Sequence, residues 1–219
     1  MYFSRLSLAG RTEPTEGILR SLRSEYGLHQ AIWDLFSDGP DRRRDFLYHF
    51  ESRTGPPAVL TLSSRPPQPS SSGWRVETKP YEPKLSAGSR FSFLLRANPV
   101  RTREGHRHDV VMDEKRRLRQ SVAAGEGLPT EAELVQSTCS DWLTRRAQGL
   151  GFRLLSARAD AYRQVELRRP RSAPIRFSTV DITGALEVVE PATFLAKSLT
   201  EGIGPAKGFG CGLLLLRRG

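Results

Sequence analysis

Residues Ser24–Phe36 read SEYGLHQAIWDLF and predict a short amphipathic helix. Placed on a 3.6-residue period, the apolar side chains share one face, which we expect to lie in a core. The residues of this face are Leu28, Ile32, Leu35 and Phe36. Ser24 is a candidate N-cap, and the run Ser37-Asp38-Gly39-Pro40 is a strong stop signal. The stretch therefore predicts one short helix between the strands on either side of it.

A second stripe on this helix is formed by Tyr26, His29 and Trp33, spaced i, i+3 and i+7. This stripe lies at the border between the core face and solvent. A histidine at such a border can pack against the core and still reach a ligand. The alternative is a half-buried histidine with a backbone partner and no chemical role.

Strand patterns surround the helix in the first half of the chain. Alternating or continuous apolar runs predict strands at residues 2–8, 45–53, 58–63 and 90–102. Between Arg65 and Gly88 there are five prolines, and only a short strand is possible there, at residues 74–79. The first half is therefore expected to be β-α-β-β with a further strand and without a full second helix.

The second half contains a charged segment at residues 113–119 and then a strongly periodic helix at 130–148, where Thr130 and Glu133 form a capping box. Two long strands are expected at 152–169 and 175–189, followed by a helix from Pro191 to about Thr200 and a last strand. Both halves resemble β-α-β-β-α-β units. We predict an α+β protein with tandem ferredoxin-like (RRM-like) domains and antiparallel sheets, divided as residues 1–103 and 104–219.

The charge balance favours a nucleic acid as the partner. The chain of 219 residues has a formal charge of +10 from 34 basic and 24 acidic residues, and 29 of the basic residues are arginine. The guanidinium fork binds phosphate in bidentate geometry and stacks on bases, whereas lysine acts as a hydrated point charge. A basic surface that only confers solubility is the alternative.

Cofactor, metal and membrane signals are weak. The two cysteines, Cys139 and Cys211, lie far apart and show no zinc-ligand spacing. The N-terminal residues lack a signal-peptide pattern, and the apolar runs are too short to span a membrane. We expect no metal, no small-molecule cofactor, no membrane partner and a cytoplasmic location.

The segment at residues 201–216, EGIGPAKGFGCGLLLL, is rich in glycine. It follows a helix and precedes a strand, which is the reverse of a phosphate-binding P-loop, and it matches only four positions of the RNA-recognition strand motif. Gly202 can end the helix in a left-handed cap, but this does not explain the remaining glycines or the single Lys207. Glycines let the backbone approach phosphate closely, so the candidate contacts are Gly202, Gly204, Lys207, Gly208 and Gly210.

A basic hairpin is predicted around a turn at residues 170–174. Six arginines lie between residues 158 and 176, against only Asp160 and Glu166. Such a hairpin can follow a phosphate backbone, and the candidate RNA contacts are Arg158, Arg163, Arg168, Arg169 and Arg171. A solvated strand edge that prevents aggregation is the alternative.

Four segments together resemble the CasE-type endoribonucleases of type I-E CRISPR Cascade complexes, in the order found in that family. They are LHQAIWDLF at 28–36, DFLYHFE at 45–51, FLLRANPVRT at 93–102 and GIGPAKGFGCGLL at 202–214. The resemblance implies two ferredoxin-like domains and cleavage of the repeat hairpin in precursor CRISPR RNA. It also implies metal-independent chemistry that leaves a 2′,3′-cyclic phosphate, and retention of the product inside Cascade with its other subunits.

The resemblance further implies that His29 and Tyr26 are catalytic and that the glycine-rich loop contacts RNA. RNA supplies its own nucleophile, so a metal-free nuclease needs only a base, an acid and stabilisation of the phosphorane. An imidazole suits either proton-transfer role near neutral pH, and the sequence does not assign the roles of His29 and Tyr26. We interpret His49 as a packing residue and His106 and His108 as exposed loop residues. The rival hypothesis is a non-catalytic RNA-binding scaffold protein of the same fold.

Overall fold

The structure is a computed structural model that describes residues 1–8, 25–37, 39, 43–51, 57–68, 74–121, 129–169 and 172–218. The chain divides into two compact units. The first comprises Met1–Lys84 together with Lys207–Leu213, and the second comprises Leu85–Ala206 together with Leu214–Gly219. The chain therefore crosses between the units three times.

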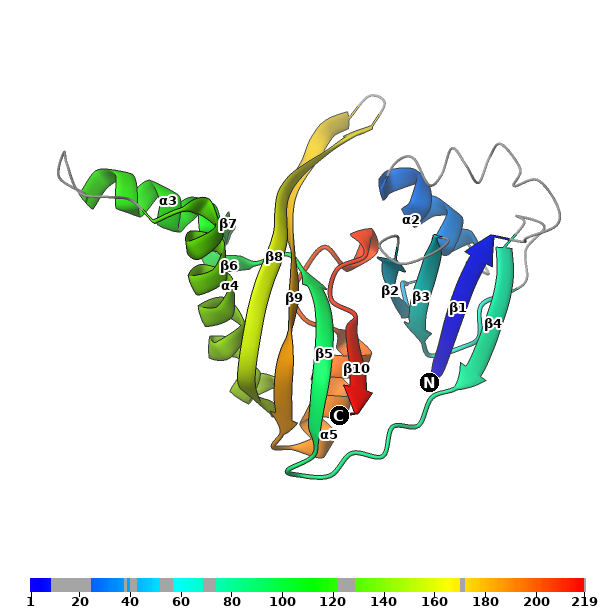
Figure 1. The fold of residues 1–219 in the computed structure, drawn as a ribbon. Coiled ribbons are helices and arrows are strands. Elements are labelled where there is room, and N and C mark those ends of the chain that lie inside the picture. The colour runs from blue at the N-terminus through cyan, green and yellow to red at the C-terminus, as the bar shows by residue number, and fades with distance from the viewer. Residues whose placement is uncertain are drawn as a thin grey trace. The chain divides into compact units, whose positions relative to one another are not determined.

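The first unit is a four-stranded antiparallel sheet with one helix among its described residues (Figure 1). Its strand order is β2-β3-β1-β4, and β1 pairs with both β3 and β4. Its elements are β1 (Tyr2–Leu8), α2 (Glu25–Asp34), β2 (Phe46–Glu51), β3 (Ala58–Ser63) and β4 (Trp74–Pro80).

The core of this unit forms where α2 packs on the sheet, as the helix periodicity predicts. Ile32 and Leu35 have no exposed surface, and they lie in one cluster with Leu6 of β1 and Val59 of β3. The predicted apolar face of the helix is confirmed. The predicted N-cap, Ser24, lies outside the described residues.

The second unit contains another four-stranded antiparallel sheet, of order β10-β5-β9-β8, and a small two-stranded sheet, β6-β7. Its strands are β5 (Arg90–Ala97), β6 (Val100–Arg103), β7 (His106–Asp109), β8 (Phe152–Arg169), β9 (Ser172–Val188) and β10 (Leu214–Arg218). Its helices are α3 (Val110–Ser121), α4 (Glu131–Ala147), the 3₁₀ turn η1 (Gln148–Leu150), the short α5 (Pro191–Thr193) and the π-helix η2 (Phe194–Glu201).

Both sheets have the ferredoxin-like order. When the sheet strands are numbered within each unit, both orders read 4-1-3-2, and every pairing is antiparallel. The predicted α+β class with tandem ferredoxin-like domains is confirmed. The boundary differs from the expected residue 103, because β5 pairs with β9 and β10 and so belongs to the unit that begins at Leu85.

Several element bounds also differ from the sequence prediction. The strand expected at 90–102 is interrupted at Asn98-Pro99, and β6 then pairs with β7 instead of extending the large sheet. Asn98 is buried and its amide donates to the carbonyl of Ser178 at 2.6 Å, which fixes the interruption. The charged segment at 113–119 lies within α3, and His106 and His108 lie in β7 instead of in a loop.

The periodic helix and its capping box are confirmed. In α4 the Thr130 hydroxyl accepts from the Glu133 backbone, and the Glu133 carboxylate accepts from the Thr130 backbone at 2.8 Å. The helix after Pro191 is also present, but most of it is the π-helix η2. It ends at Gly202, whose φ of 80° and ψ of 159° lie outside the left-handed helical conformation that we expected.

The long hairpin of β8 and β9 extends beyond the rest of its sheet (Figure 1). Asp109 connects the middle of this hairpin to the start of α3 through hydrogen bonds. One carboxylate oxygen of Asp109 accepts from the backbone of Val111 at 2.8 Å, and the other accepts from the hydroxyls of Tyr162 and Ser178. Burial, followed by the Asp109 charge, raises the pKa of Tyr162, so this phenol stays a donor. Asp109 thus joins both hairpin strands to the start of α3.

Gly184 in β9 provides a test of the hairpin register. Gly184 pairs with Ala157, close to the irregularity between Leu154 and Ser156 of β8, and a Cβ at residue 184 would clash with the carbonyl oxygen of Ser156. We expect Gly184→Ala to lower the free energy of unfolding by about 1–3 kcal/mol, measured by urea denaturation. The control is Gly149→Ala, because a Cβ there meets nothing within 4 Å, and it should leave stability unchanged or slightly raised. Equal denaturation midpoints for the two variants would contradict this register.

Candidate active site

His29 lies in α2, on the stripe predicted to border the core face, and it is half-buried. Its ring contacts two aromatic rings, Trp33 of the same helix at 5.9 Å between centroids and Phe209 at 5.5 Å. Both contacts are tilted. Leu28 and Ile32 fix the helix backbone on the core, so the imidazole is held in place from the helix side and from the Phe209 side.

Phe209 belongs to a loop from near the end of the chain. Residues Lys207–Phe209 form the short 3₁₀ turn η3, and this loop is part of the first unit. A Cβ at Gly208 would lie 3.4 Å from Cε1 and 3.6 Å from Nδ1 of His29. The absence of a side chain at residue 208 therefore lets the backbone pass next to the imidazole.

Tyr48 anchors the same loop from the sheet. Its side chain is almost fully buried in β2, and its hydroxyl donates to the Gly208 carbonyl at 2.9 Å. Gly210 lies next to this ring: a Cβ at residue 210 would be only 3.1 Å from Cε2 of Tyr48. Its φ of +75° also favours glycine. These contacts set the position of Gly208 beside His29.

The surroundings of His29 favour its neutral form. Burial lowers the pKa of the imidazole below 6.5, the Gly208 backbone opposes this, and the positive charge of Arg44 lowers it further. Nδ1 is buried and no described residue meets hydrogen-bond geometry with it, so the Gly208 carbonyl acts on the ring as a nearby dipole. At neutral pH the ring is therefore uncharged and able to accept a proton.

Arg44 is the neighbour of this site that the sequence analysis missed. It is half-buried just before β2, and its Nη1 would lie 3.8 Å from a Cβ at Gly208. The adjacent carboxylate, Asp45, accepts instead from Arg65 at 2.8 Å and from the Ser64 hydroxyl at 2.9 Å. Within the described part of the chain, Arg44 forms no ion pair. The only sequence signal was its place at the end of the run Arg42-Arg43-Arg44.

The other predicted site residues fall into separate groups. Tyr26 lies in the first turn of α2, half-buried and one turn before His29. Lys207 directly precedes Gly208 in η3. Gly202 and Gly204 belong to the second unit, where a Cβ at Gly204 would lie 3.4 Å from the Trp142 ring.

The arginines of the hairpin are partly engaged with acidic or hydroxyl groups. Arg158 pairs with Asp160 at 2.8 Å, and Arg163 donates to the Thr179 hydroxyl at 3.3 Å. Arg168 and Arg169 end β8, but their side chains, like the whole of Arg171, lie outside what the structure describes. The predicted hairpin is present, although β9 begins at Ser172 instead of residue 175. Its role in binding stays a prediction.

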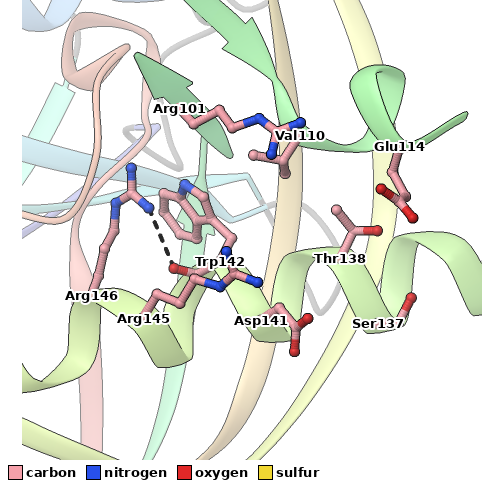
Figure 2. Close-up of a pocket in the computed structure, with 9 residues that line it drawn as sticks. All are labelled: Arg101, Val110, Glu114, Ser137, Thr138, Asp141, Trp142, Arg145 and Arg146. Atoms are coloured by element: carbon pink, nitrogen blue, oxygen red, sulfur yellow. Dashed lines mark hydrogen bonds between the residues drawn. The ribbon is translucent and has the colours of Figure 1, made fainter. Parts of the chain in front are cut away.

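A second concave site lies between α3, α4 and β6, with a cavity of about 270 Å³ (Figure 2). Its cations are engaged within the fold. Arg101 pairs with Asp113 at 3.0 Å, and Arg146 stacks over the Trp142 ring at 4.5 Å and donates to the carbonyl of Val100. These contacts connect the small sheet to α4, so we interpret this cavity as part of the packing.

Among the described residues, no group of three or more His, Cys, Asp or Glu side chains could hold a metal ion. His49 is buried in β2, in agreement with its interpretation as a packing residue. No helix in the described ranges is long and apolar enough to cross a membrane.

The fold and this site define a two-unit ferredoxin-like protein in which a half-buried histidine lies next to a glycine loop. The sequence matches the family described as CRISPR associated protein over residues 1–218, and the chain belongs to this family.

Similar proteins match over most of their lengths. The chain is 33% identical to the CRISPR system Cascade subunit CasE of Escherichia coli strain K12, over 89% of this chain and 92% of that protein. It is 31% identical to the CRISPR-associated endoribonuclease Cse3 of Thermus thermophilus, over 89% of this chain and 90% of that protein. A solved structure of the CRISPR endoribonuclease Cse3 bound to 19 nt RNA aligns with a TM-score of 0.74 and 27% identity, covering 99% of this chain and all of that chain. The predicted resemblance to CasE-type proteins is confirmed.

We expect the titration of His29 to follow its surroundings. Because burial and Arg44 lower its pKa in the folded protein, its NMR titration midpoint should lie below 6.5, and His29→Gln should remove that signal. The unfolded ring takes up its proton near pH 6.5, so the free energy of unfolding should fall as the pH drops from 6.5 through the lowered midpoint. A midpoint at or above 6.5 would contradict this placement of the ring.

Proposed function

We propose that this chain is an endoribonuclease that cuts precursor CRISPR RNA within its hairpin repeats and stays bound to the product as a subunit of Cascade. The names of its relatives support RNA endonuclease activity, since one is called an endoribonuclease and another a Cascade subunit. A neighbour that shares 27% of its sequence has been solved with RNA bound. We also propose that the protein works in the cytoplasm and without a cofactor.

One observation carries the chemical part of this proposal. A neutral, partly buried imidazole lies against the backbone of Gly208. Because residue 208 has no side chain, the loop backbone and the imidazole come close to each other. A packing histidine would not require a glycine at its ring edge or an arginine without an ion pair among the described residues beside it. A site that binds a phosphodiester and moves a proton makes use of both, since it needs an accessible base and a nearby positive charge.

The reaction we propose is a metal-independent transesterification. His29 takes the proton of the 2′-hydroxyl as general base, and the 2′-oxygen forms a bond to phosphorus. The bond from phosphorus to the 5′-oxygen breaks, and the leaving oxygen receives a proton. The products are a 2′,3′-cyclic phosphate and a 5′-hydroxyl, so neither water nor an oxidant is consumed.

The structure favours the base role for His29 because its lowered pKa leaves the ring unprotonated at neutral pH. Tyr26, one helical turn away, is our candidate for the donor that faces the phosphate or the leaving oxygen. Lys207 precedes the glycine that approaches the imidazole, and we propose that it contributes positive charge to RNA binding.

RNA binding is proposed for two surfaces. The first is the loop with Gly208 and Gly210, and we keep Gly202 and Gly204 as weaker candidates because they pack in the second unit. The second is the hairpin with Arg158, Arg163, Arg168, Arg169 and Arg171. Exposed ion pairs such as that of Arg158 with Asp160 contribute little to stability, so such an arginine can exchange its carboxylate for phosphate at small cost.

The decisive experiment for the function is incubation of the purified protein with labelled repeat RNA in EDTA. We expect one cut within the repeat and a cyclic-phosphate end. A gel shift without any cut would instead favour the rival function, a non-catalytic RNA-binding scaffold protein.

We expect His29→Ala to slow single-turnover cleavage by about 10²–10⁴-fold, because that is the usual contribution of a general base. Affinity for RNA should change little, since the arginine and glycine contacts remain. Tyr26→Phe should slow cleavage less, because its ring stays in place. The control is His106→Ala, an exposed histidine of β7, which should cut at the parent rate. Cleavage at the parent rate by a folded His29→Ala protein would remove this residue from the chemistry.

We expect the hairpin to determine the salt dependence of binding. Changing both Arg168 and Arg169 to Ala should weaken RNA binding and flatten the plot of log K against log salt by roughly one slope unit or less per lost phosphate contact. The matched control removes the same charge from Arg217 and Arg218 at the end of the edge strand β10. If both double variants change the slope equally, the effect reflects net charge and the hairpin is no specific contact.

A further inference from the structure

Arg44 has an unusual environment for an arginine in this protein. Its guanidinium is half-buried and forms no ion pair among the described residues, whereas exposed arginines such as Arg90 and Arg158 do form ion pairs. Burial lowers the pKa of Arg44, and Tyr48 opposes this, but an arginine stays charged at neutral pH. Partial burial of a charge without a counterion costs free energy, and a bound anion would offset this cost.

The neighbouring groups leave Arg44 available. Asp45, the nearest carboxylate in sequence, is engaged by Arg65 and Ser64. The Tyr48 hydroxyl is directed to the Gly208 carbonyl at 2.9 Å. Among the described residues, Oδ2 of Asp45 and the Tyr48 hydroxyl are therefore hydrogen-bonded to groups other than Arg44.

The position of Arg44 relative to the imidazole matters for the kind of ligand. The same reference point, a Cβ at Gly208, would lie 3.4 Å from His29 Cε1 and 3.8 Å from Arg44 Nη1. The imidazole and the guanidinium thus border one small space next to a residue without a side chain. An anion with several oxygens matches a cation beside a proton acceptor, and a phosphodiester is such an anion.

We propose that Arg44 is a catalytic residue that binds the non-bridging oxygens of the scissile phosphate and stabilises the extra negative charge of the phosphorane. This rests on the proposed function, since it names the group that holds the reacting phosphate in that same site. The guanidinium fork supplies two donors to two oxygens, which the single ammonium of a lysine does not. As a fixed cation it acts on the charge that develops during attack by the 2′-oxygen.

The first test measures binding and needs no cleavage. Repeat RNA is made with a 2′-deoxy nucleotide before each linkage in turn, and with a neutral methylphosphonate at that linkage. We expect one linkage at which the methylphosphonate weakens binding to the parent by about tenfold or more and has no effect on Arg44→Ala. If no linkage shows this coupling, Arg44 contacts no single phosphate and the proposal fails.

The second test measures rate at saturating RNA. Removal of one preorganised donor to a developing oxyanion typically costs about 10²–10³-fold, so we expect a loss of that size for Arg44→Ala, partial recovery for Arg44→Lys and rescue of Arg44→Ala by added guanidinium ion. Arg43→Ala is the matched control, because it removes the same charge from the adjacent exposed position and should cut at the parent rate.

A pH profile separates this role from an indirect one through His29. Removing the Arg44 charge raises the pKa of the imidazole, so at a pH well above both midpoints the base is fully unprotonated in the parent and in the variant. The charged and titratable residues next to His29, in the fold or along the chain, are Arg44, Lys207, Tyr48 and Tyr26. A rate loss that persists on this plateau supports direct stabilisation, whereas recovery to the parent rate shows that Arg44 only tunes His29 and overturns the proposal.

The two tests also distinguish this proposal from the proposed function. A parent protein that never cuts, but shows the linkage-specific coupling to Arg44, has the phosphate site without the reaction. A parent that cuts, with neither coupling nor rate loss in Arg44→Ala, is an endoribonuclease in which Arg44 is structural. If Arg44→Ala fails to fold, Arg44→Gln replaces it in the same linkage series: loss of the coupling in that variant supports the proposal, and its persistence overturns it.

Discussion

The hydrogen bond from the Tyr48 hydroxyl to the Gly208 carbonyl joins residues that are 160 positions apart, and the site depends on it. Tyr48 is buried in the core cluster of the first unit, so its hydroxyl is a fixed point. A buried phenol needs a partner, and the loop carbonyl supplies it. Because this carbonyl is held on the sheet side, the loop passes the ring of His29, and Phe209 packs against that ring. The anchor therefore places one loop of a distant segment on a helix of the first unit.

This anchor also explains why the glycine-rich run is divided. Gly202 and Gly204 lie in the second unit, where Gly204 makes room for the Trp142 ring and adopts a φ of +80°. Gly208 and Gly210 lie in the first unit, where they make room for the imidazole and the phenol. The run thus serves two different packing problems on successive segments. The run is continuous in the sequence, but the chain crosses between the units at residues 206 and 207, so its two parts pack in different units.

Local patterns in the sequence predict local features well. The apolar period of α2, the capping box of α4 and the strands β3 and β8 each depend on neighbours in the chain, and all are found in the structure. Tertiary contacts cannot be predicted from the spacing of residues in the sequence. Two examples are the pairing of Asp45 with Arg65 and the approach of Gly208 to His29. Arg44 was missed for this reason, since an arginine without an ion pair among the described residues is recognised only when its surroundings are known. Asn98-Pro99 was missed because a strand pattern of alternating residues continues through it, while the buried amide of Asn98 stops the strand.

The arginines of this protein also show why position matters more than number. A paired arginine on the hairpin, such as Arg176 with Glu166, loses little when phosphate replaces the carboxylate, so it can contribute to affinity and to salt dependence. Arg44 differs because its charge is already partly removed from water before any ligand arrives, and no described carboxylate compensates for it. The free energy lost in that arrangement is recovered only when an anion binds, and most strongly when that anion gains charge. A neutral imidazole beside it avoids a second positive charge at the same place, so the two groups are compatible in the free protein and complementary in the reaction.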